Sequence, residues 1–424
     1  MLSRKTLVIT SCCVTALVAV LLLNLSLADK RIDTQVRPLY TVQDPQFLRS
    51  MGVMLGPTIL PGNKVTALQN GDQIFPSMLQ AINAATSTIN FESYIYWSGK
   101  VGRQFADALA AKARAGVKVH VMIDWVGSSK ISDDLLKEME AAGVQVRRYN
   151  PPHWYKFGRF NNRTHRKLLV VDGKIGFTGG VGIADLWSGN GQDPDHWRDS
   201  HYRLEGPAVA QMQAAFHDNW TEITGTVMHG PEYFPALAPA GSQAAQVFIS
   251  SPGGGGESMQ LMYLLSIAAA TRNLRIAASY FVPDQVTMAA LVAAVRRGVK
   301  VQLILPGPST DSETTRAASK EKWGELLRAG AEIYEYQPTM FHCKVMVVDE
   351  LWTSVGSTNF DNRSFAINDE ANLNIHDREF ALEQIATFEN DLKRARRITL
   401  EEWEQRPWLE KVKELFTTAV GSQL

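Results

Sequence analysis

Cysteine is scarce in this 424-residue chain, which has only three. Cys12 and Cys13 lie next to each other in an apolar segment, and Cys343 lies far along the chain, so no disulfide framework follows from them. No Cys-x-x-Cys pair is present either. The cysteine content therefore excludes a small domain held together by disulfides and a zinc module built on that pattern.

The chain also lacks an excess of charge of either sign. It has 43 basic and 43 acidic residues and a formal net charge of zero, whereas domains that bind duplex nucleic acid usually carry a basic excess. This balance argues against nucleic acid as a partner, although a local basic groove stays open. The run Gly253–Gly256 is not followed by Gly-Lys-Ser/Thr, so we interpret it as a flexible turn rather than a phosphate-binding loop.

What the chain does contain is typical of a folded protein with a large core. Hydrophobic residues make up 45% and charged residues 20%. The length is compatible with two or three domains.

The amino terminus differs from the rest of the chain. Arg4 and Lys5 precede an uncharged, mostly apolar run from Thr6 to Ala28, which is long enough to span a bilayer as a helix. We interpret residues 1–28 as an uncleaved anchor that leaves the basic end inside and the body of the protein outside. A cleavable signal peptide is the alternative, because Ser26-Leu-Ala28 resembles a signal peptidase site.

An eight-residue pattern occurs twice. His165-Arg-Lys167-Leu-Leu-Val-Val-Asp172 is repeated as His342-Cys-Lys344-Val-Met-Val-Val-Asp349. The apolar runs are rich in β-branched residues, so each copy is predicted to lie on a buried strand. Because side chains alternate along a strand, the His and the Lys of each copy share one face.

Two histidines and two lysines at one point suit the chemistry of a phosphodiester. One neutral imidazole can attack phosphorus, and the other, when protonated, can donate to the leaving alcohol. The two lysines would offset the charge on the phosphoryl oxygens, and no metal is needed. We take the six residues of the two patterns as candidate catalytic residues: His165, Lys167, Asp172, His342, Lys344 and Asp349.

An internal repeat predicts the architecture. Residues 109–123 and 291–305 both read as a helix that stops at a Gly and is followed by an apolar strand, and residues 139–146 and 326–333 repeat this unit. Upstream, 89–95 pairs with 274–280. The alternation predicts an α/β fold of two duplicated lobes related by a pseudo-twofold axis, each with a mixed, largely parallel sheet flanked by helices.

These patterns also predict domain boundaries. We expect a signal anchor or signal peptide at 1–28, a linker region at 29–69, a first lobe at 70–230, a connection at 231–256 and a second lobe at 257–424. After Pro407, an apolar stripe predicts a carboxyl-terminal amphipathic helix that docks on the core or lies on a membrane. An aromatic and basic segment, 153–160, precedes His165; acyl-chain contact and ordinary packing both explain it.

The duplicated pattern resembles the phospholipase D superfamily, and its flanks resemble the bacterial cardiolipin synthases. The flanks are Gly173–Gly180 and Trp197–Ala208 after the first copy, and Gly356–Glu370 after the second. The resemblance runs from about residue 70 to the carboxyl end. It implies a two-lobed fold, a phosphohistidine intermediate and no metal or other cofactor.

The resemblance also implies roles for individual residues. His165 would be the nucleophile and His342 the general acid and base, although the sequence is symmetrical in this respect. Lys167, Lys344 and Asn359 would hold the phosphoryl group. The carboxylates of Asp199 and Glu370 would orient the imidazoles, and Ser357 and Gly180 are further candidates for substrate binding or support. The chain has Gly182 where many relatives have an Asn that matches Asn359, so one amide donor is missing.

The expected function is a phosphatidyl transfer between two phosphatidylglycerol molecules that yields cardiolipin and glycerol. The expected partners are phospholipids of a bacterial inner membrane and no nucleic acid, with the catalytic body in the periplasm, either anchored or released after cleavage. Three alternatives stay open. They are a hydrolase of the same fold or another phosphatidyltransferase, a secreted nuclease, and an inactive lipid-binding protein.

Overall fold

The structure is a computed structural model that describes residues 3–26, 32, 34–37, 40–152, 162–252, 256–408 and 410–411. The aromatic segment before His165 and the start of the Gly253–Gly256 run lie outside the described residues. So do the proposed signal peptidase site at Ala28 and most of the predicted carboxyl-terminal helix.

The amino-terminal 33 residues form a unit of their own, separate from the compact unit Thr34–Leu424. Helix α1 (Arg4–Ser26) occupies most of it. Among the described residues, no helix combines the length and the apolarity that a membrane crossing requires. The predicted anchor is therefore not confirmed.

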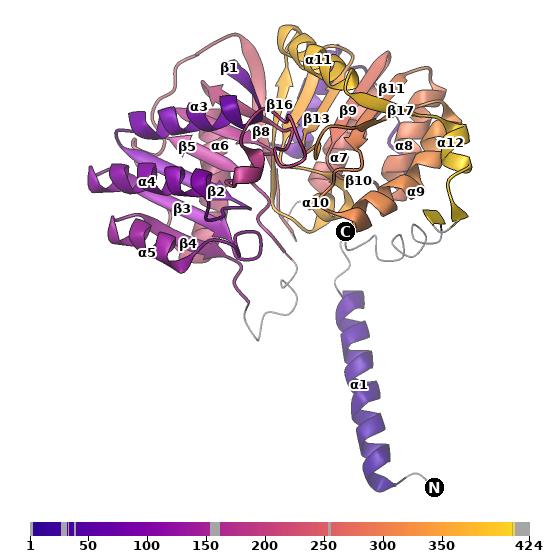
Figure 1. The fold of residues 1–424 in the computed structure, drawn as a ribbon, viewed down its shortest axis with the longest axis horizontal. Helices are drawn as coiled ribbons and strands as arrows, with labels where there is room; N and C mark the ends of the chain where they lie inside the picture. Colours follow the sequence, from indigo (N-terminus) through magenta and orange to yellow (C-terminus); the bar gives the residue numbers. More distant parts are fainter. Residues whose placement is uncertain are drawn as a thin grey trace. The chain divides into compact units, whose positions relative to one another are not determined.

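The repeat appears as two lobes that follow each other along the chain (Figure 1). The main elements of the first lobe are β1 (Leu60–Gln69), α3 (Asn70–Ala84), β2 (Thr88–Ser93), α4 (Lys100–Arg114), β3 (Lys118–Asp124), α5 (Asp133–Ala141), β4 (Gln145–Tyr149), β5 (Leu168–Val171), β6 (Ile175–Gly179), η3 (Asp185–Trp187), β7 (Ser200–Glu205) and α6 (Val209–Thr224). Before them, α2 (Pro45–Ser50) runs into the π-helical turn η1 (Met51–Leu55).

The second lobe repeats this order. Its elements are β8 (Gln243–Ser250), α7 (Gly256–Ala269), β9 (Asn273–Ala278), β10 (Phe281–Val282), α8 (Gln285–Arg296), β11 (Lys300–Pro306), α9 (Glu313–Ala329), β12 (Glu332–Tyr336), β13 (Lys344–Val348), β14 (Trp352–Gly356), β15 (Phe360–Asp361), α10 (Asn362–Ala366), β16 (Glu370–His376), α11 (Arg378–Leu392), β17 (Ala395–Ile398) and α12 (Leu400–Glu404). The predicted α/β duplication is confirmed.

Glycines end the repeated helices as the sequence indicates. Gly116 after α4 and Gly298 after α8 both have φ +91, a left-handed conformation that costs glycine nothing and strains other residues. Each helix thereby stops within a few residues of the strand that follows, β3 or β11.

One sheet of 15 strands runs through both lobes, in the order β17-β12-β11-β9-β13-β14-β16-β8-β1-β7-β6-β5-β2-β3-β4. The two lobes meet at the antiparallel pair β1–β8. The expectation of a largely parallel sheet is wrong. Within this sheet the parallel pairs are β2–β3, β3–β4, β9–β11 and β11–β12, and the other pairs are antiparallel.

The reason for this difference is the length of the connections. The helix–Gly–strand units leave room for a helical crossover, which parallel strands need. After each His-Lys pattern, however, only a tight turn separates β5 from β6 and β13 from β14. Such a turn joins antiparallel strands only.

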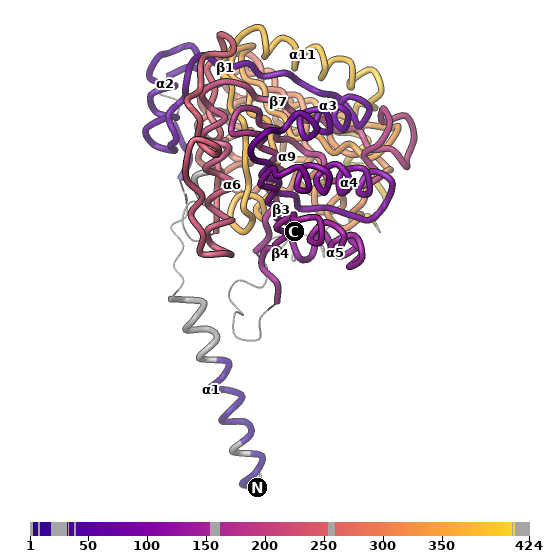
Figure 2. The backbone as a smooth tube through the Cα atoms, turned by 90° about the vertical axis from the view of Figure 1, so that its left-hand side faces the viewer, coloured from indigo at the N-terminus to yellow at the C-terminus, as the bar shows by residue number. Residues whose placement is uncertain are grey.

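Helices cover both faces of the first lobe's sheet. Leu169 and Val171 of β5 belong to a core with residues of α3, α4 and α5. Leu168 and Val170, which point the other way, pack with α6. Figure 2 shows the three helices on one side of the strands and α6 on the other. The His-Lys strand is thus buried on both faces.

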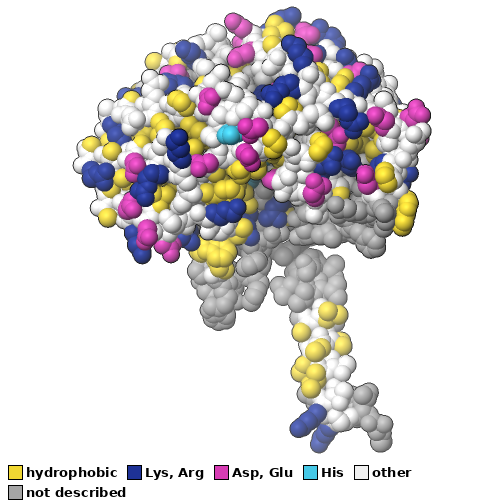
Figure 3. Space-filling view, viewed as in Figure 1, with side chains coloured by type: hydrophobic (Ala, Val, Ile, Leu, Met, Phe, Trp, Pro, Cys, Tyr) yellow, Lys and Arg dark blue, Asp and Glu magenta, His cyan; other side chains and the backbone are white. Residues whose placement is uncertain are grey.

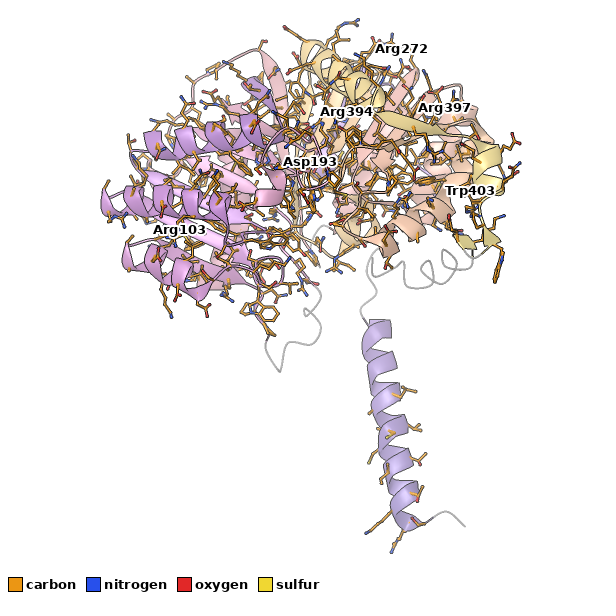
Figure 4. The ribbon with its side chains drawn as sticks, viewed as in Figure 1. Arg103, Asp193, Arg272, Arg394, Arg397 and Trp403 are labelled. Atoms are coloured by element: carbon orange, nitrogen blue, oxygen red, sulfur yellow. The ribbon has the colours of Figure 1, made fainter. Side chains whose placement is uncertain are left out.

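The surface carries charges of both signs. On the face in Figure 3, basic and acidic side chains are interspersed over both lobes, without an extended basic area. Some of them connect helices, such as Arg103 on α4, which pairs with Glu138 on α5 (Figure 4). This distribution matches the balanced composition.

Candidate active site

The two His-Lys patterns stand at the starts of β5 and β13. His165 and Lys167 directly precede β5, His342 precedes β13, and Lys344 is the first residue of β13. All four side chains are almost completely buried, between 4% and 7% exposed. In each pattern the residue between His and Lys turns away. The guanidinium of Arg166 bonds to the carbonyl of Ala215 on α6 at 2.8 Å.

Each histidine is oriented by a carboxylate from the other lobe. His165 Nδ1 lies 2.9 and 3.0 Å from the two oxygens of Glu370. His342 Nδ1 lies 2.7 Å from Asp199 Oδ2. Both carboxylates are fully buried. With Nδ1–H donated to the carboxylate, Nε2 of each ring is the nitrogen left for chemistry.

Backbone hydrogen bonds between the lobes hold each histidine close to the carboxylate of the other lobe. The N–H of His165 donates to the carbonyl of Asp369 at 2.9 Å, and the N–H of His342 donates to the carbonyl of Arg198 at 2.8 Å. Each histidine is therefore held beside the residue that precedes its carboxylate partner. Each of these two histidine–carboxylate pairs therefore draws one residue from each lobe.

The two lysines differ in their surroundings. Lys167 Nζ donates to the carbonyl of His165 at 2.7 Å and lies 5.4 Å from the centre of the Tyr94 ring. Lys344 Nζ donates to Ser279 Oγ at 2.7 Å, and this hydroxyl donates to Asn359 Oδ1 at 2.8 Å. The Asn359 amide nitrogen is thereby left as the donor end of that side chain.

Burial and charge set the protonation of these groups. Burial, with Lys167 and Lys344 nearby, lowers the pKa of His165 well below its ordinary value. Burial also lowers the pKa of His342, but Asp199 opposes that shift. The Lys344 pKa is lowered by burial as well, and that of Lys167 falls to about 7.

The two carboxylates respond in opposite directions. Burial raises the pKa of Glu370 to about 7, although Lys167 opposes the shift. Burial acts on Asp199 in the same sense, but His342, Lys344 and the N–H of Ser200 outweigh it and bring its pKa below the ordinary value. At neutral pH Asp199 is ionised, while Glu370 is close to half protonated.

A cleft of about 1060 Å³ opens onto both histidines. Its first-lobe wall contains an aromatic and apolar group formed by Tyr94, Ile95, Trp97, Leu186, Trp187 and Trp197, together with polar residues that include Lys130, Arg163 and Asp185. Its second-lobe wall is polar and is formed by Tyr280, Asp311, Ser312, Thr315, Asn359 and Arg363. His196 at the rim is held by Asp193 at 2.6 Å, and Figure 4 labels Asp193 where the lobes meet. The cleft is large enough for a lipid headgroup and part of its glycerol backbone.

The structure does not bring Asp172 and Asp349 to this cleft. They follow β5 and β13 at the ends opposite the histidines. Asp172 accepts hydrogen bonds from the N–H groups of residues 86–88 at 2.7 to 3.1 Å. Asp349 accepts from those of residues 271–273 at 2.8 to 2.9 Å. These contacts place both aspartates at a turn, and their assignment as catalytic residues stays a prediction.

Ser357 and Gly180 lie at equivalent positions behind the two carboxylates. Ser357 Oγ donates to Glu370 Oε2 at 2.5 Å. At Gly180, a Cβ would come within 2.2 Å of Asp199 Oδ1. The serine thus supports one carboxylate, and the glycine makes room for the other.

Sequence reasoning missed three residues of the site. Ser279 connects Lys344 to Asn359, Tyr94 lies over Lys167, and Trp187 bonds to Asp199. The repeat itself held a signal for the first two, because Tyr94 and Ser279 occupy matching places in 89–95 and 274–280. No pattern marked Trp187. Among the described residues, no group of His, Cys, Asp and Glu forms a metal site.

Comparison with known proteins gives a consistent result. Residues 78–219 and 263–392 match a family described as "Cardiolipin synthase, PLD-like domain". The cardiolipin synthase of Geobacillus kaustophilus (strain HTA426) is 34% identical over 355 residues, which cover 83% of this chain and 70% of that protein. The major cardiolipin synthase ClsA of Bacillus subtilis (strain 168) is 35% identical over 355 residues, 83% of this chain and 73% of that protein.

A solved structure shows the same fold at lower identity. The phosphatidylserine synthase of Haemophilus influenzae Rd KW20 superposes with a TM-score of 0.68 at 14% identity, covering 89% of this chain and 99% of that one. At this identity the likeness concerns the fold alone.

Proposed function

The chain belongs to the cardiolipin synthase family of the phospholipase D superfamily, and on that premise we propose that it makes cardiolipin from two phosphatidylglycerol molecules. The names of its relatives give the product, cardiolipin, and phosphatidylglycerol is the donor and acceptor that we propose. The observation that carries the proposal is the site. Two histidines, each oriented by a carboxylate of the other lobe, face one cleft that Lys167 also lines. Lys344 bonds to Ser279, which in turn bonds to Asn359 in the cleft lining.

The first step is a transfer to His165. Its Nε2 attacks phosphorus of the donor lipid, the bond from phosphorus to the glycerol oxygen breaks, and a phosphohistidine forms. His342 gives its proton to the departing glycerol. The lowered pKa of His165 keeps it neutral and able to attack. The ionised Asp199 favours the protonated form of His342.

The second step reverses these proton transfers. His342, now neutral, takes the proton from the free glycerol hydroxyl of a second phosphatidylglycerol as that oxygen attacks the phosphohistidine. The bond from phosphorus to His165 breaks, and cardiolipin leaves. One phosphodiester replaces another, so the chain's own groups suffice for every bond made and broken.

The phosphoryl oxygens would be held by three donors. Lys167 and Asn359 line the cleft, and Lys344 connects to Asn359 through the hydroxyl of Ser279. These groups offset the negative charge that the phosphoryl group carries through both steps.

We also propose a location at the bacterial inner membrane, with the catalytic body in the periplasm. The basic residues Arg4 and Lys5 before the apolar run and the bilayer location of the substrate support it. Membrane fractionation with a reporter fused to Leu424 tests the proposal. A soluble fusion protein or cytoplasmic reporter activity would contradict it.

The function is tested by product analysis. The full-length protein is incubated with phosphatidylglycerol vesicles without added metal or nucleotide, beside the His165→Ala variant. We expect cardiolipin and glycerol in equal amounts from the wild type and neither from the variant. Phosphatidic acid as the sole lipid product would make the protein a hydrolase. No turnover would overturn the proposed reaction.

A further inference from the structure

The two halves of the site can be matched position by position through their backbones. The N–H of Gly180 donates to the carbonyl of Ser200, and the N–H of Ser357 donates to that of Ala371. Three residues later, Ile183 and Phe360 each donate to the matching strand end, at Ile95 and Tyr280. Gly182 therefore corresponds to Asn359, and Trp187 in η3 corresponds to Ser364 in α10.

The space that an amide would need at position 182 is already filled. A Cβ on Gly182 would lie 2.9 Å from Ile95 Cβ and 3.1 and 3.2 Å from two ring carbons of Trp187. Trp187 is only 1% exposed and its indole is held by Asp199, so the ring cannot shift without losing that contact. The first lobe has exchanged a polar side chain at this place for an indole.

The indole reaches the catalytic pair directly. Trp187 Nε1 donates to Asp199 Oδ2 at 2.9 Å, and the same oxygen accepts from His342 Nδ1 at 2.7 Å. The two rings also meet edge to face, with centroids 5.4 Å apart. One carboxylate oxygen thus connects Trp187 to the histidine that handles the proton.

The corresponding carboxylate in the second half is supported differently. Glu370 accepts from the hydroxyl of Ser357, and Ser364, the counterpart of Trp187, adds a further hydroxyl donor. A hydroxyl can rotate away from its acceptor, whereas an indole N–H in a packed ring has one direction. The indole of Trp187 therefore fixes the orientation of the Asp199 carboxylate more firmly than the hydroxyls fix that of Glu370.

We propose that Trp187 is a positioning residue of the reaction, which fixes the Asp199 carboxylate through its indole N–H and thereby holds His342 in place. The consequence for catalysis rests on the proposed function; the contact itself does not. The donated hydrogen bond also draws charge from Asp199 Oδ2, so the carboxylate stabilises a protonated His342 less strongly than it would alone. Trp187 thus keeps the proton on His342 available for release.

The test replaces the N–H while keeping the ring. In Trp187→Phe we expect the basic limb of the rate against pH to move up by about half a unit to one unit, because Asp199 then holds the His342 proton more tightly. We expect kcat to fall about 5- to 20-fold with little change in KM for phosphatidylglycerol, because aim is lost and not substrate contact. Trp97→Phe is the matched control. Trp97 lies on the same cleft wall, but its indole N–H donates to the Gly127 carbonyl at 2.8 Å and not to a carboxylate.

A second replacement guards against loss of the fold. Benzothienylalanine introduced at position 187 alone keeps the bicyclic shape and lacks the N–H, so packing is preserved. The same shift of the basic limb is expected. If Trp187→Phe unfolds, this variant decides the question.

A readout without turnover separates this proposal from the proposed function. The chain has nine histidines, and the ring signal of His342 can be assigned by its loss in His342→Gln. Its titration midpoint by NMR should rise in both variants at Trp187 and stay constant in Trp97→Phe. An unmoved midpoint in both variants would overturn the proposal, whether or not the wild-type protein makes cardiolipin.

Discussion

The two histidine–carboxylate pairs have the same geometry and opposite electrostatics. His165 with Glu370 and His342 with Asp199 are both buried pairs that connect the lobes at 2.7 to 3.0 Å. Yet the pKa of Glu370 is raised to about 7, and the pKa of Asp199 is lowered. The partly protonated Glu370 therefore stabilises a protonated His165 less than the ionised Asp199 stabilises a protonated His342. The different surroundings of the two carboxylates are consistent with the different roles that we propose for the two histidines.

Replacing each histidine alone should give the largest changes in the rate of transfer. We expect His165→Ala to lower the transfer rate by about 10⁴-fold or more, because no covalent intermediate can form. We expect His342→Ala to lower it by about 10²–10⁴-fold with phosphatidylglycerol, because the leaving glycerol then lacks its acid. Stopped-flow measurement with a p-nitrophenyl phosphatidyl ester separates the two variants.

Nitrophenolate leaves without a proton, so His342→Ala should release about one equivalent in a burst and then stall as a phosphohistidine. His165→Ala should give no burst. A burst from His165→Ala and none from His342→Ala would reverse the roles. Equal behaviour of the two variants would remove the distinction between the halves.

The carboxylates should show a smaller and pH-dependent difference. We expect Asp199→Asn to lower kcat about 10²- to 10³-fold throughout pH 6 to 8, because this group is ionised over the whole range. Glu370→Gln should cost about tenfold at pH 8 and about twofold at pH 6. The reason is that a carboxyl with a pKa of about 7 is mostly protonated at pH 6 and already resembles an amide.

Rate against pH for the two variants and the wild type is the measurement. The ratio of wild type to Glu370→Gln should rise with pH, and that for Asp199→Asn should stay flat. A flat ratio for both would show that Glu370 is ionised throughout and that the two pairs do not differ in charge.

The sequence predicted the reacting residues of the site better than the contacts that hold them in place. The repeated His-Lys pattern named four of the buried residues, and the resemblance named Asp199 and Glu370, which do bond to the histidines. Patterns along one strand cannot show which lobe contacts which, so the exchange of carboxylates between lobes appeared only in three dimensions. Trp187 lies in the same lobe as Asp199, but the two residues belong to different elements and no repeated pattern marks the pair.

The helix–strand units of the fold were predicted correctly, but the direction of many strands in the sheet was not. The Gly-terminated helices before β3 and β11 carry a local signal, and both formed as expected. The direction of β5 relative to β2 depends on a long connection, which leaves no periodic trace. Asp172 and Asp349 were grouped with the histidines because the eight residues of each pattern are consecutive, but a strand separates the two ends of the pattern.

These two aspartates offer the last and smallest test, since here the halves have stayed alike. Each accepts from three consecutive N–H groups and adopts a left-handed φ of +53 or +50, which Asn tolerates as well as Asp. We expect Asp172→Asn and Asp349→Asn each to lower the free energy of unfolding by about 1–2 kcal/mol, as for the loss of a charged acceptor. The rate of transfer should change less than about twofold. Urea unfolding and product analysis measure both quantities.

The stability lost in Asp172→Asn should depend on pH. Burial raises its pKa, but the N–H groups of residues 86–88 outweigh burial and bring it below 3.8. A carboxyl whose pKa is lower in the folded state stabilises the fold above the unfolded value and loses this effect as the pH falls through the folded value. The difference between wild type and Asp172→Asn should therefore be complete above about pH 5 and shrink below about pH 4. A fall in kcat of tenfold or more with an unchanged free energy of unfolding would instead support a catalytic role for both aspartates.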